Sequence, residues 1–261
     1  MDDSQYRAHP AVSYSGMKEL AKSPAHFRYN QLHPVAENEA MLRGIIIHEM
    51  CLEPAEVPNR FIKGPTGNRT LKAVKEAWKE AEEKAQQDGL RIIPPAMWET
   101  AERCSESLES DVESSLWLDD ARRGIIERPI FWKRQGIELK GKPDSVLLDG
   151  TVVDIKTTAN CFPPVFEAEI FRRNYHCQGA FYRSGVQSLG ERWSSHVLIC
   201  VETEPPYAVA VFRLNEGVID NADKVVTGWI DLYKQCLEFK RWPGYGLREV
   251  RTPAWAAQQA D

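Results

Sequence analysis

The chain has 261 residues, of which 43% are hydrophobic and 27% are charged, the composition of an ordinary globular protein. Its formal net charge is −5, and the acidity is concentrated in residues 76–123, which hold thirteen Asp or Glu and six Lys or Arg. This distribution neither supports nor excludes a DNA partner. No run of eighteen apolar residues occurs, which excludes a membrane-spanning helix, and the polar N-terminus does not have the pattern of a signal peptide. We therefore expect a cytoplasmic protein with no membrane partner.

The first half of the chain predicts helices. Residues 13–32 indicate a helix that is broken at Ser23-Pro24, because proline cannot continue a preceding helix. Residues 37–53 form a dense apolar run that ends at Pro54 and also predicts a helix. Further helices are expected at about 70–88, 95–110 and 114–122.

The second half of the chain begins with strand-like runs. Residues 125–133, 137–148 and 151–157 are separated by short turns, and Asp149-Gly150 is a strong signal for a tight hairpin. These turns argue against a wholly parallel sheet, because parallel strands need long crossover connections. After them we expect a long helix at about 164–188, strands at 194–203 and 207–214, and an amphipathic helix at about 217–240.

These elements predict an α/β protein with a central mixed sheet, made of a three-strand meander plus two further strands and flanked by helices. We expect one domain over residues 1–261. It comprises a mainly helical annex over 1–123, a core over 124–246 and a tail over 247–261.

The six cysteines give no sign of a metal cluster. The closest two, Cys161 and Cys177, are sixteen residues apart, and no C-x-x-C pair occurs. Zinc and iron–sulfur sites usually take ligands from tight local pairs. We therefore expect these cysteines to be buried as small hydrophobic residues and expect no iron–sulfur cluster.

The residues that carry chemistry lie on the predicted hairpin. Asp144 and Asp154 flank its turn, so they can meet near one end, and Asp154 and Lys156 point to one face because they are two residues apart on a strand. Two carboxylates and an ammonium on an apolar strand need partners or a metal. Mg²⁺ prefers oxygen ligands, and a lysine can orient or deprotonate water or stabilise negative charge. The group fits metal-assisted phosphodiester hydrolysis; an exposed hairpin with a weak Asp154–Lys156 pair is the structural alternative.

The pattern Pro143-Asp144, nine residues, then Asp154-Ile155-Lys156 resembles the signature of the PD-(D/E)xK nuclease superfamily. Upstream, the stretch from Gly44 to His48 resembles the G-x-x-x-H element of the RecB-like branch, in which the histidine ligates a metal. Downstream, Gln178 and Tyr182 resemble the Q-x-x-x-Y helix of that branch, and Tyr175 shares their helical face.

The two ends of the chain extend the resemblance. The opening Ser13-x-Ser15-x-Met17-x-x-Leu20 and the closing Trp242-Pro243-Gly244-Tyr245 resemble the phage-type RecE exonuclease (exodeoxyribonuclease VIII) group. The motifs cover about residues 10–246 and follow the order of that family. The resemblance implies a Mg²⁺-dependent exonuclease, with Mn²⁺ as a substitute, that digests linear double-stranded DNA from a 5′ end and leaves a 3′ tail for recombination.

The resemblance also implies partners. Members of the group act as closed homo-oligomeric rings that thread the duplex, and they work with a single-strand annealing protein of the RecT type. A ring reconciles an acidic chain with DNA, because only its channel needs to be basic.

The resemblance implies roles for individual residues. The predicted catalytic residues are Lys156, Asp154 and Asp144, and the predicted metal ligands are His48, Asp144, Asp154 and the backbone carbonyl of Ile155. Glu127, on the strand before the hairpin, is a further candidate ligand, with a structural charge as the alternative. Residues expected to support the site or contact DNA are Gln178, Tyr182 and Tyr175, together with Arg43, Arg28 and Ser23 for gripping a terminal phosphate.

Two other readings of the sequence stay open. One is a different RecB-type or Cas4-like nuclease, although the iron–sulfur clasp of some of these enzymes needs closely spaced cysteines near the C-terminus, and only Cys236 lies there. The other is a degenerate nuclease fold that binds DNA or assembles without cleaving it, which the presence of Asp144, Asp154 and Lys156 argues against. A glycosidase would have no role for the lysine.

Overall fold

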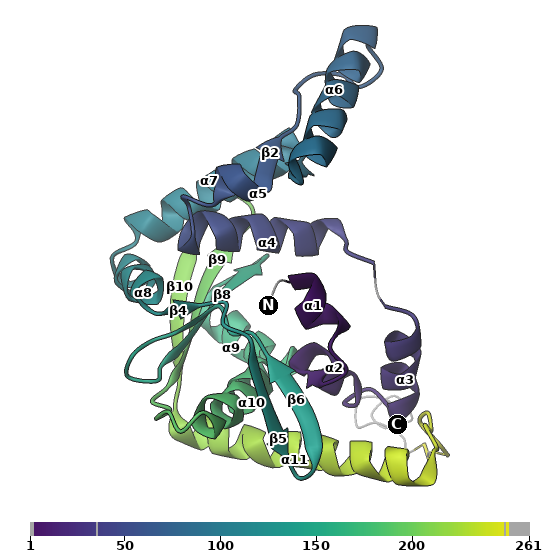
Figure 1. Cartoon of the computed structure of the whole chain (residues 1–261). Coiled ribbons are helices and arrows are strands. Elements are labelled where there is room, and N and C mark those ends of the chain that lie inside the picture. The colour runs from purple at the N-terminus through teal and green to yellow at the C-terminus, as the bar shows by residue number, and fades with distance from the viewer. Residues whose placement is uncertain (1–2, 35, 248, 251–261) are drawn as a thin grey trace, which may run out of the picture.

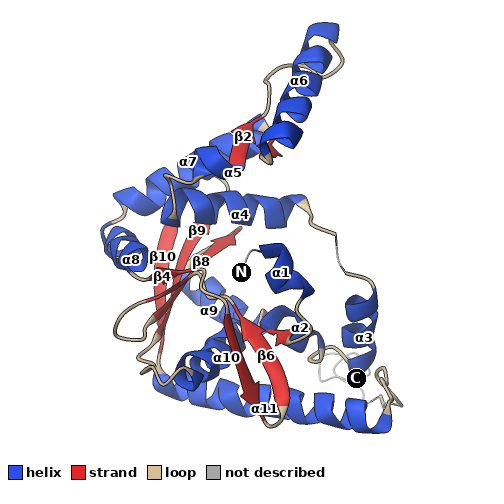
Figure 2. Ribbon diagram, in the orientation of Figure 1, coloured by secondary structure: helices blue, strands red, loops and turns tan. Residues whose placement is uncertain are grey.

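The fold was analysed in a computed structural model, which describes residues 3–34, 36–247 and 249–250, so most of the tail predicted over 247–261 lies outside the described residues. Figures 1 and 2 show a twisted sheet with helices on both faces. Its five strands run in the order β10-β9-β8-β7-β4. The central pair, β8 (Val152–Thr158) and β9 (His196–Glu202), is parallel, and the outer pairings are antiparallel. The outer strands are β10 (Val209–Leu214), β7 (Ser145–Val146) and β4 (Ile125–Ile126). The predicted α/β class with a mixed sheet is confirmed.

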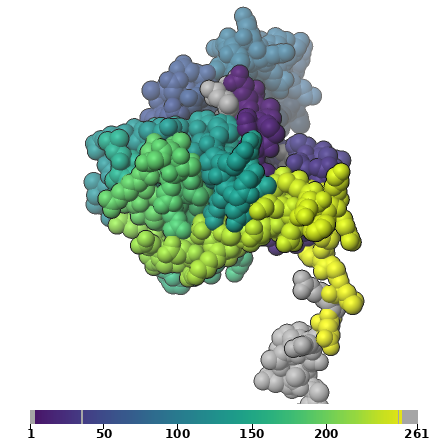
Figure 3. All heavy atoms as spheres, turned by 60° about the horizontal axis from the view of Figure 1, so that its bottom comes forward, coloured from purple at the N-terminus to yellow at the C-terminus, as the bar shows by residue number. Residues whose placement is uncertain are grey.

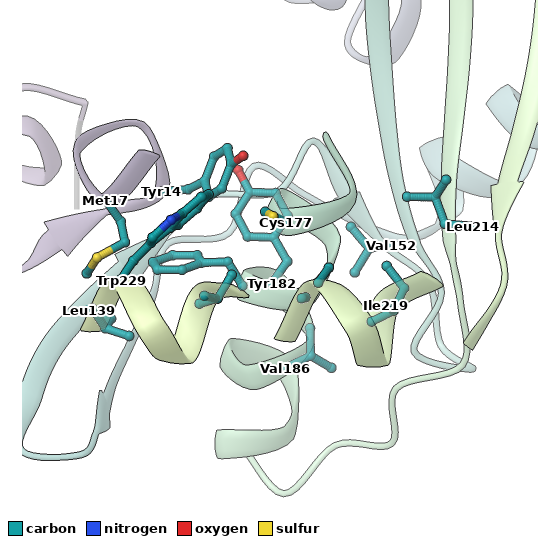
Figure 4. Packing of buried hydrophobic residues seen from close by; sticks show 14 of the residues in the cluster. Tyr14, Met17, Leu139, Val152, Cys177, Tyr182, Val186, Leu214, Ile219 and Trp229 are labelled. Carbon is teal, nitrogen blue, oxygen red and sulfur yellow. The ribbon is translucent and has the colours of Figure 1, made fainter. Parts of the chain in front are cut away.

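Side-chain alternation along β8 and β9 divides the protein interior into two clusters. Val152 and Leu198 belong to the first cluster, whereas Val153 and Ile155 belong to the second. Three helices supply about half of the first cluster, part of which is shown in Figure 4: α9 (Pro163–Arg172), α10 (Tyr175–Ser188) and α11 (Glu216–Phe239). The second cluster is covered by α4 (Glu39–Leu52), α7 (Pro95–Ser110) and α8 (Val112–Arg123).

The predicted three-strand meander needs a correction. Two of its runs each divide into two strands, so that β5 (Ile130–Arg134) and β6 (Ile137–Gly141) join the short β1 (Val12–Ser13) in a separate sheet. The breaks have local causes. Glu127 adopts a left-handed φ of 47°, and Pro129 and Pro143 have no N–H for a strand ladder. The hairpin therefore changes sheets just before Asp144.

The predicted long helix over 164–188 is also divided. It forms α9 and α10, because Asn174 takes a left-handed φ of 61° between them. The first predicted helix forms α2 (Tyr14–Glu19) and α3 (Pro24–Leu32), with the break at Ser23-Pro24 that the sequence indicates. The helices expected near 37–53, 95–110, 114–122 and 217–240 are confirmed.

The helical annex is part of the core except for one projection. Tyr14 and Met17 enter the first cluster, and Ile46 and Ile47 the second. The exception is α6 (Lys72–Asp88), which projects from the rest of the molecule in Figure 1. At its base lie α5 (Val57–Arg60) and the parallel pair β2 (Phe61–Lys63) and β3 (Arg91–Ile93).

The N-terminal helix α1 (Asp3–Ala8) lies against the three-stranded sheet of β1, β6 and β5, and Figure 3 shows it in purple at the surface. Its C-terminal carbonyls are held by Lys140, whose ammonium donates to the backbone oxygens of Tyr6 and Arg7 and to that of His9. All six cysteines are buried and unpaired, as expected. Within the described ranges, none of the helices has the length and apolar character needed to cross a membrane.

Candidate active site

The candidate site is built at an open edge of β8. Strand β7 pairs with β8 only as far as Val153, so the edge backbone of Ile155 has no strand beside it. Two side chains contact the N–H and the carbonyl of Ile155 instead. The Ile155 N–H donates to Asp144 Oδ2 at 2.8 Å, and the Ile155 carbonyl lies 2.9 Å from His48 Nε2. The end of β7 thus creates the place where Asp144 and His48 meet the strand.

Asp154 is the most deeply buried member of the site, with no exposed surface. Its Oδ1 accepts from the Asp144 N–H at 3.4 Å, and its Oδ2 lies 3.7 Å from Lys156 Nζ. Burial by itself would raise the pKa of Asp154, but the Lys156 ammonium and the imidazole of His196 outweigh it and hold the pKa well below its usual value. The carboxylate is therefore held in its charged form.

Lys156 and His48 border the same group from two sides. The Lys156 side chain is 12% exposed and its ammonium lies 5.4 Å from the centre of the Tyr175 ring. Burial lowers the pKa of Lys156, but Asp154 and Asp144 raise it further than burial lowers it. His48 Nδ1 lies 3.2 Å from Asp144 Oδ2, and this contact likewise outweighs burial and raises the pKa of His48.

Two linked hydrogen bonds from α10 border the site on the side of the first cluster. Gln178 Nε2 donates to the Tyr182 hydroxyl at 3.2 Å, and that hydroxyl donates to the carbonyl of Lys142 at 3.3 Å. The predicted helical face of Tyr175, Gln178 and Tyr182 is therefore turned toward the hairpin. A cleft of about 400 Å³ opens here, lined by Gln178, Tyr182, Lys142 and residues of α1 and α2. The described cavities of about 510 and 430 Å³ lie beside α5, away from these residues.

Residues 13–250 match the family described as "PDDEXK-like domain of unknown function (DUF3799)". The chain belongs to this family. The superfamily that Asp144, Asp154 and Lys156 indicate is thereby confirmed. A search of curated proteins gave no match to this sequence.

Solved structures resemble this chain to different degrees. A protein from Eubacterium rectale that is provisionally named an exonuclease superposes with a TM-score of 0.65 at 15% identity, over 97% of this chain and 95% of that one. Two more distant matches are a phage-related exonuclease from Haemophilus somnus 129PT and an alkaline exonuclease from Laribacter hongkongensis. Their TM-scores are 0.35 and 0.31 at 10% and 13% identity, covering 90% and 74% of this chain and 98% and 96% of theirs.

Glu127 lies beside the PDDEXK-like site and has a partner of its own. Its backbone N–H donates to the Asp144 carbonyl at 3.0 Å, and its carboxylate lies 2.5 Å from Lys142 Nζ. The side chain thus forms an ion pair at the strand edge, while its role as a metal ligand stays a prediction. Glu49, next to His48, forms an ion pair with Arg60 at 2.6 Å.

Ser23 and Arg28, two of the three residues predicted to grip a terminal phosphate, have other partners in the structure. The buried Ser23 hydroxyl accepts from the His26 N–H and caps α3. Arg28 donates to Gln31 and lies over the Trp242 ring. Arg43 lies five residues before His48 on α4, which turns it about 140° around the helix. None of these contacts places the three residues with Asp144, Asp154 and Lys156, and their role stays a prediction.

His196 Nε2 lies 2.8 Å from Asp154 Oδ2, a contact that was not predicted from the sequence. The residue opens the apolar strand β9, and it has no spacing relation to Asp154 along the chain. The only signal was a polar residue at the head of a strand whose next five residues are apolar. Such a signal indicates burial but names no partner.

The donor atoms of the site suit a hard divalent cation. The carboxylates of Asp144 and Asp154, the Ile155 carbonyl and the His48 ring supply oxygens and one imidazole nitrogen, which Mg²⁺ and Mn²⁺ accept. Over the part of the chain that is described, no three His, Cys, Asp or Glu side chains gather closely enough to hold a metal by themselves. The Ile155 carbonyl, together with water and a substrate phosphate, would therefore have to complete the ligand set.

Proposed function

We propose that this protein is a metal-dependent exodeoxyribonuclease that hydrolyses phosphodiester bonds of linear double-stranded DNA. One observation carries the proposal. Asp144, Asp154 and Lys156 converge at the open edge of β8, and His48 arrives there from α4. A structural hairpin would have no need to gather two carboxylates, a lysine and a histidine around one carbonyl that no strand pairs with at this edge. PDDEXK nucleases generally use divalent metal ions at such a group of residues.

Each residue has a task in this proposal. Asp144, Asp154, the Ile155 carbonyl and His48 would hold Mg²⁺, with Mn²⁺ as a substitute. When bound, the cation supplies positive charge to the scissile phosphate and makes water a better nucleophile. Lys156 orients the attacking water and stabilises the negative charge that develops on the phosphate. Tyr175 packs beside the Lys156 ammonium and limits the directions in which it can point.

The surroundings of Lys156 favour a polyanionic substrate. Burial lowers the pKa of Lys18 on α2, Glu19 raises it, and the positive charges of Lys22, Arg173 and Lys156 lower it. Lys18 is therefore repelled by these three cations. A strand of DNA relieves such repulsion, because its phosphates neutralise the lysines and arginines that contact it. The local positive charge lets an acidic chain bind DNA.

The finer parts of the proposal rest on the resemblance to the RecE group. We propose 5′-to-3′ digestion that leaves 3′ single-stranded tails, a homo-oligomeric ring around the duplex, and a partner that anneals the tails as RecT-type proteins do. We place the reaction in DNA recombination of the phage type and in the cytoplasm.

A single experiment tests activity and direction together. Purified protein is incubated with Mg²⁺ and linear duplex labelled at the 5′ or the 3′ end, with and without a 5′ phosphate. A covalently closed circle of the same sequence serves as the control. We expect the 5′ label to be released first and the circle to stay intact, and we expect EDTA, Asp154→Ala and Lys156→Ala each to abolish release.

The opposite results are equally informative. Cleavage of the closed circle would make the protein an endonuclease. DNA binding without cleavage in Mg²⁺ and in Mn²⁺ across a range of pH would replace the enzyme by a DNA-binding module on a nuclease fold.

A further inference from the structure

A second histidine, His196, contacts the candidate site from within the protein. It is the first residue of β9, and like Asp154 it has no exposed surface. In the parallel β8–β9 pair its register partner is Val152, two residues before Asp154, so both side chains project from the same face. The imidazole Nε2 reaches Asp154 Oδ2 at 2.8 Å. Because His196 is fully buried, it cannot contact DNA.

The space for the His196 ring is built into α10. A Cβ atom added at Gly179 would lie 3.0 Å from His196 Nδ1 and 2.7 Å from Ile219 Cδ1, so no larger residue fits there without movement. On the next turn the Tyr182 ring lies nearly parallel to the imidazole, at 11° with 6.3 Å between centroids. A glycine inside a helix is less favourable than alanine. The glycine therefore serves close packing against the histidine.

The polar contacts of His196 lead to Asp154. Among the described residues, neither ring nitrogen of His196 has a hydrogen-bond partner of good geometry. The carboxylate that lies within ion-pair distance of the ring is that of Asp154. Asp154 Oδ2 also lies 3.7 Å from Lys156 Nζ, so the carboxylate is held between an imidazole and an ammonium. If this position served packing alone, an apolar residue would give a more favourable free energy of folding, because a polar ring loses its hydration when it is buried.

We propose that His196 is a positioning residue for Asp154. Its imidazole fixes Oδ2 from the protein side, which leaves Oδ1 turned toward Asp144 and the open edge of β8, where a cation would bind. Residues that orient a metal-binding carboxylate typically affect metal affinity by about 10- to 100-fold. This inference deepens the proposed nuclease function and rests on it.

Two substitutions at one position separate positioning from packing. His196→Met removes the nitrogen but keeps an apolar side chain of similar length, whereas His196→Gln keeps an N–H donor near the place of Nε2. We expect the Met variant to bind Mg²⁺ and Mn²⁺ about 10- to 100-fold more weakly in calorimetric titrations without DNA. We expect the Gln variant to stay within a few-fold of the wild type. In nuclease assays the concentration of Mg²⁺ at half-maximal rate should shift in the same order, with the KM for DNA unchanged.

A second pair of variants covers the case in which His196→Met does not fold. Gly179→Ala presses a methyl group against the imidazole and Ile219 and should also weaken metal binding. Gly228→Ala is its matched control, because this glycine lies in α11 with no atom within 4 Å of an added Cβ. We expect the control to keep wild-type metal affinity and nuclease activity.

The outcomes distinguish the two proposals. Wild-type metal affinity in His196→Met overturns the positioning role, as do equal losses of affinity in the Met and Gln variants with equal drops in melting temperature. If the wild type binds the metal and the Met variant does not, yet neither cleaves DNA, the positioning role stands and the proposed nuclease activity fails.

Discussion

The two faces of β8 pack against different kinds of residue. Val153 and Ile155 face the second cluster, which is largely apolar, and the buried Ser145 opposite Val153 donates its hydroxyl to the Ala121 carbonyl. Asp154 and Lys156 face the side of α10, and there the fold supplies a histidine, a helical glycine and a tyrosine hydroxyl around them. Buried charge is costly unless it is paired. One strand thus serves stability on one face and chemistry on the other, and the chemical face needs the more specialised surroundings.

The two faces meet at α4. Ile46 and Ile47 are fully buried in the second cluster, and the next residue, His48, reaches past the open edge of β8 to the Ile155 carbonyl and Asp144. The helix that packs on the apolar face therefore also completes the site. Substitution of His48 should then mainly affect activity, whereas substitution of its neighbour Ile47 should mainly affect stability.

The largest effect is expected for His48→Ala. The substitution removes the imidazole from Asp144 and the Ile155 carbonyl and should lower kcat/KM on linear duplex by on the order of 100-fold. The free energy of unfolding should fall by about 1 kcal/mol, because the substitution leaves the Ile155 carbonyl without its partner. Nuclease rates and denaturant unfolding measure the two quantities. The exposed His33→Ala is the control, and full activity of the His48 variant would remove this residue from the site.

Much of this architecture could be predicted because it depends on short-range signals. The Asp149-Gly150 turn and the two-residue alternation are enough to bring Asp144 toward Asp154 and to put Lys156 on the same face. The contact of His48 with the hairpin could not be derived in this way, since 107 residues separate it from Ile155. Its inclusion came from the resemblance to a family.

Other features could not be predicted because they depend on backbone conformations or distant contacts. Glu127 and Asn174 divide a strand run and a helix by adopting a left-handed φ, which sequence periodicity does not reveal. His196 and Gly179 fit each other only after α10 has packed on the sheet. Periodicity shows that these segments are buried, but it does not show which buried polar residue contacts which.

A smaller effect is expected for Tyr182→Phe on the chemical face. The change removes the hydroxyl that links Gln178 to the Lys142 carbonyl and leaves that carbonyl without the bond, at a cost of about 1 kcal/mol in the free energy of unfolding. Activity should fall several-fold, because Lys142 lies two residues before Asp144. Gln178→Ala should reproduce part of the loss. An increase in stability with unchanged activity would show that the hydroxyl does not hold the hairpin.

The smallest effect, and the strictest test of the comparison, is expected for Ile47→Val. This residue adjoins His48 in sequence, but its side chain lies wholly in the second cluster. Loss of one methylene group should lower the free energy of unfolding by about 0.5–1.5 kcal/mol. The rate of the folded enzyme at saturating Mg²⁺ should stay unchanged, because the backbone that carries His48 does not move. If Ile47→Val instead lowered this rate as well as the free energy of unfolding, packing on the apolar face would control where α4 places His48. The two faces of β8 would then be coupled rather than separate.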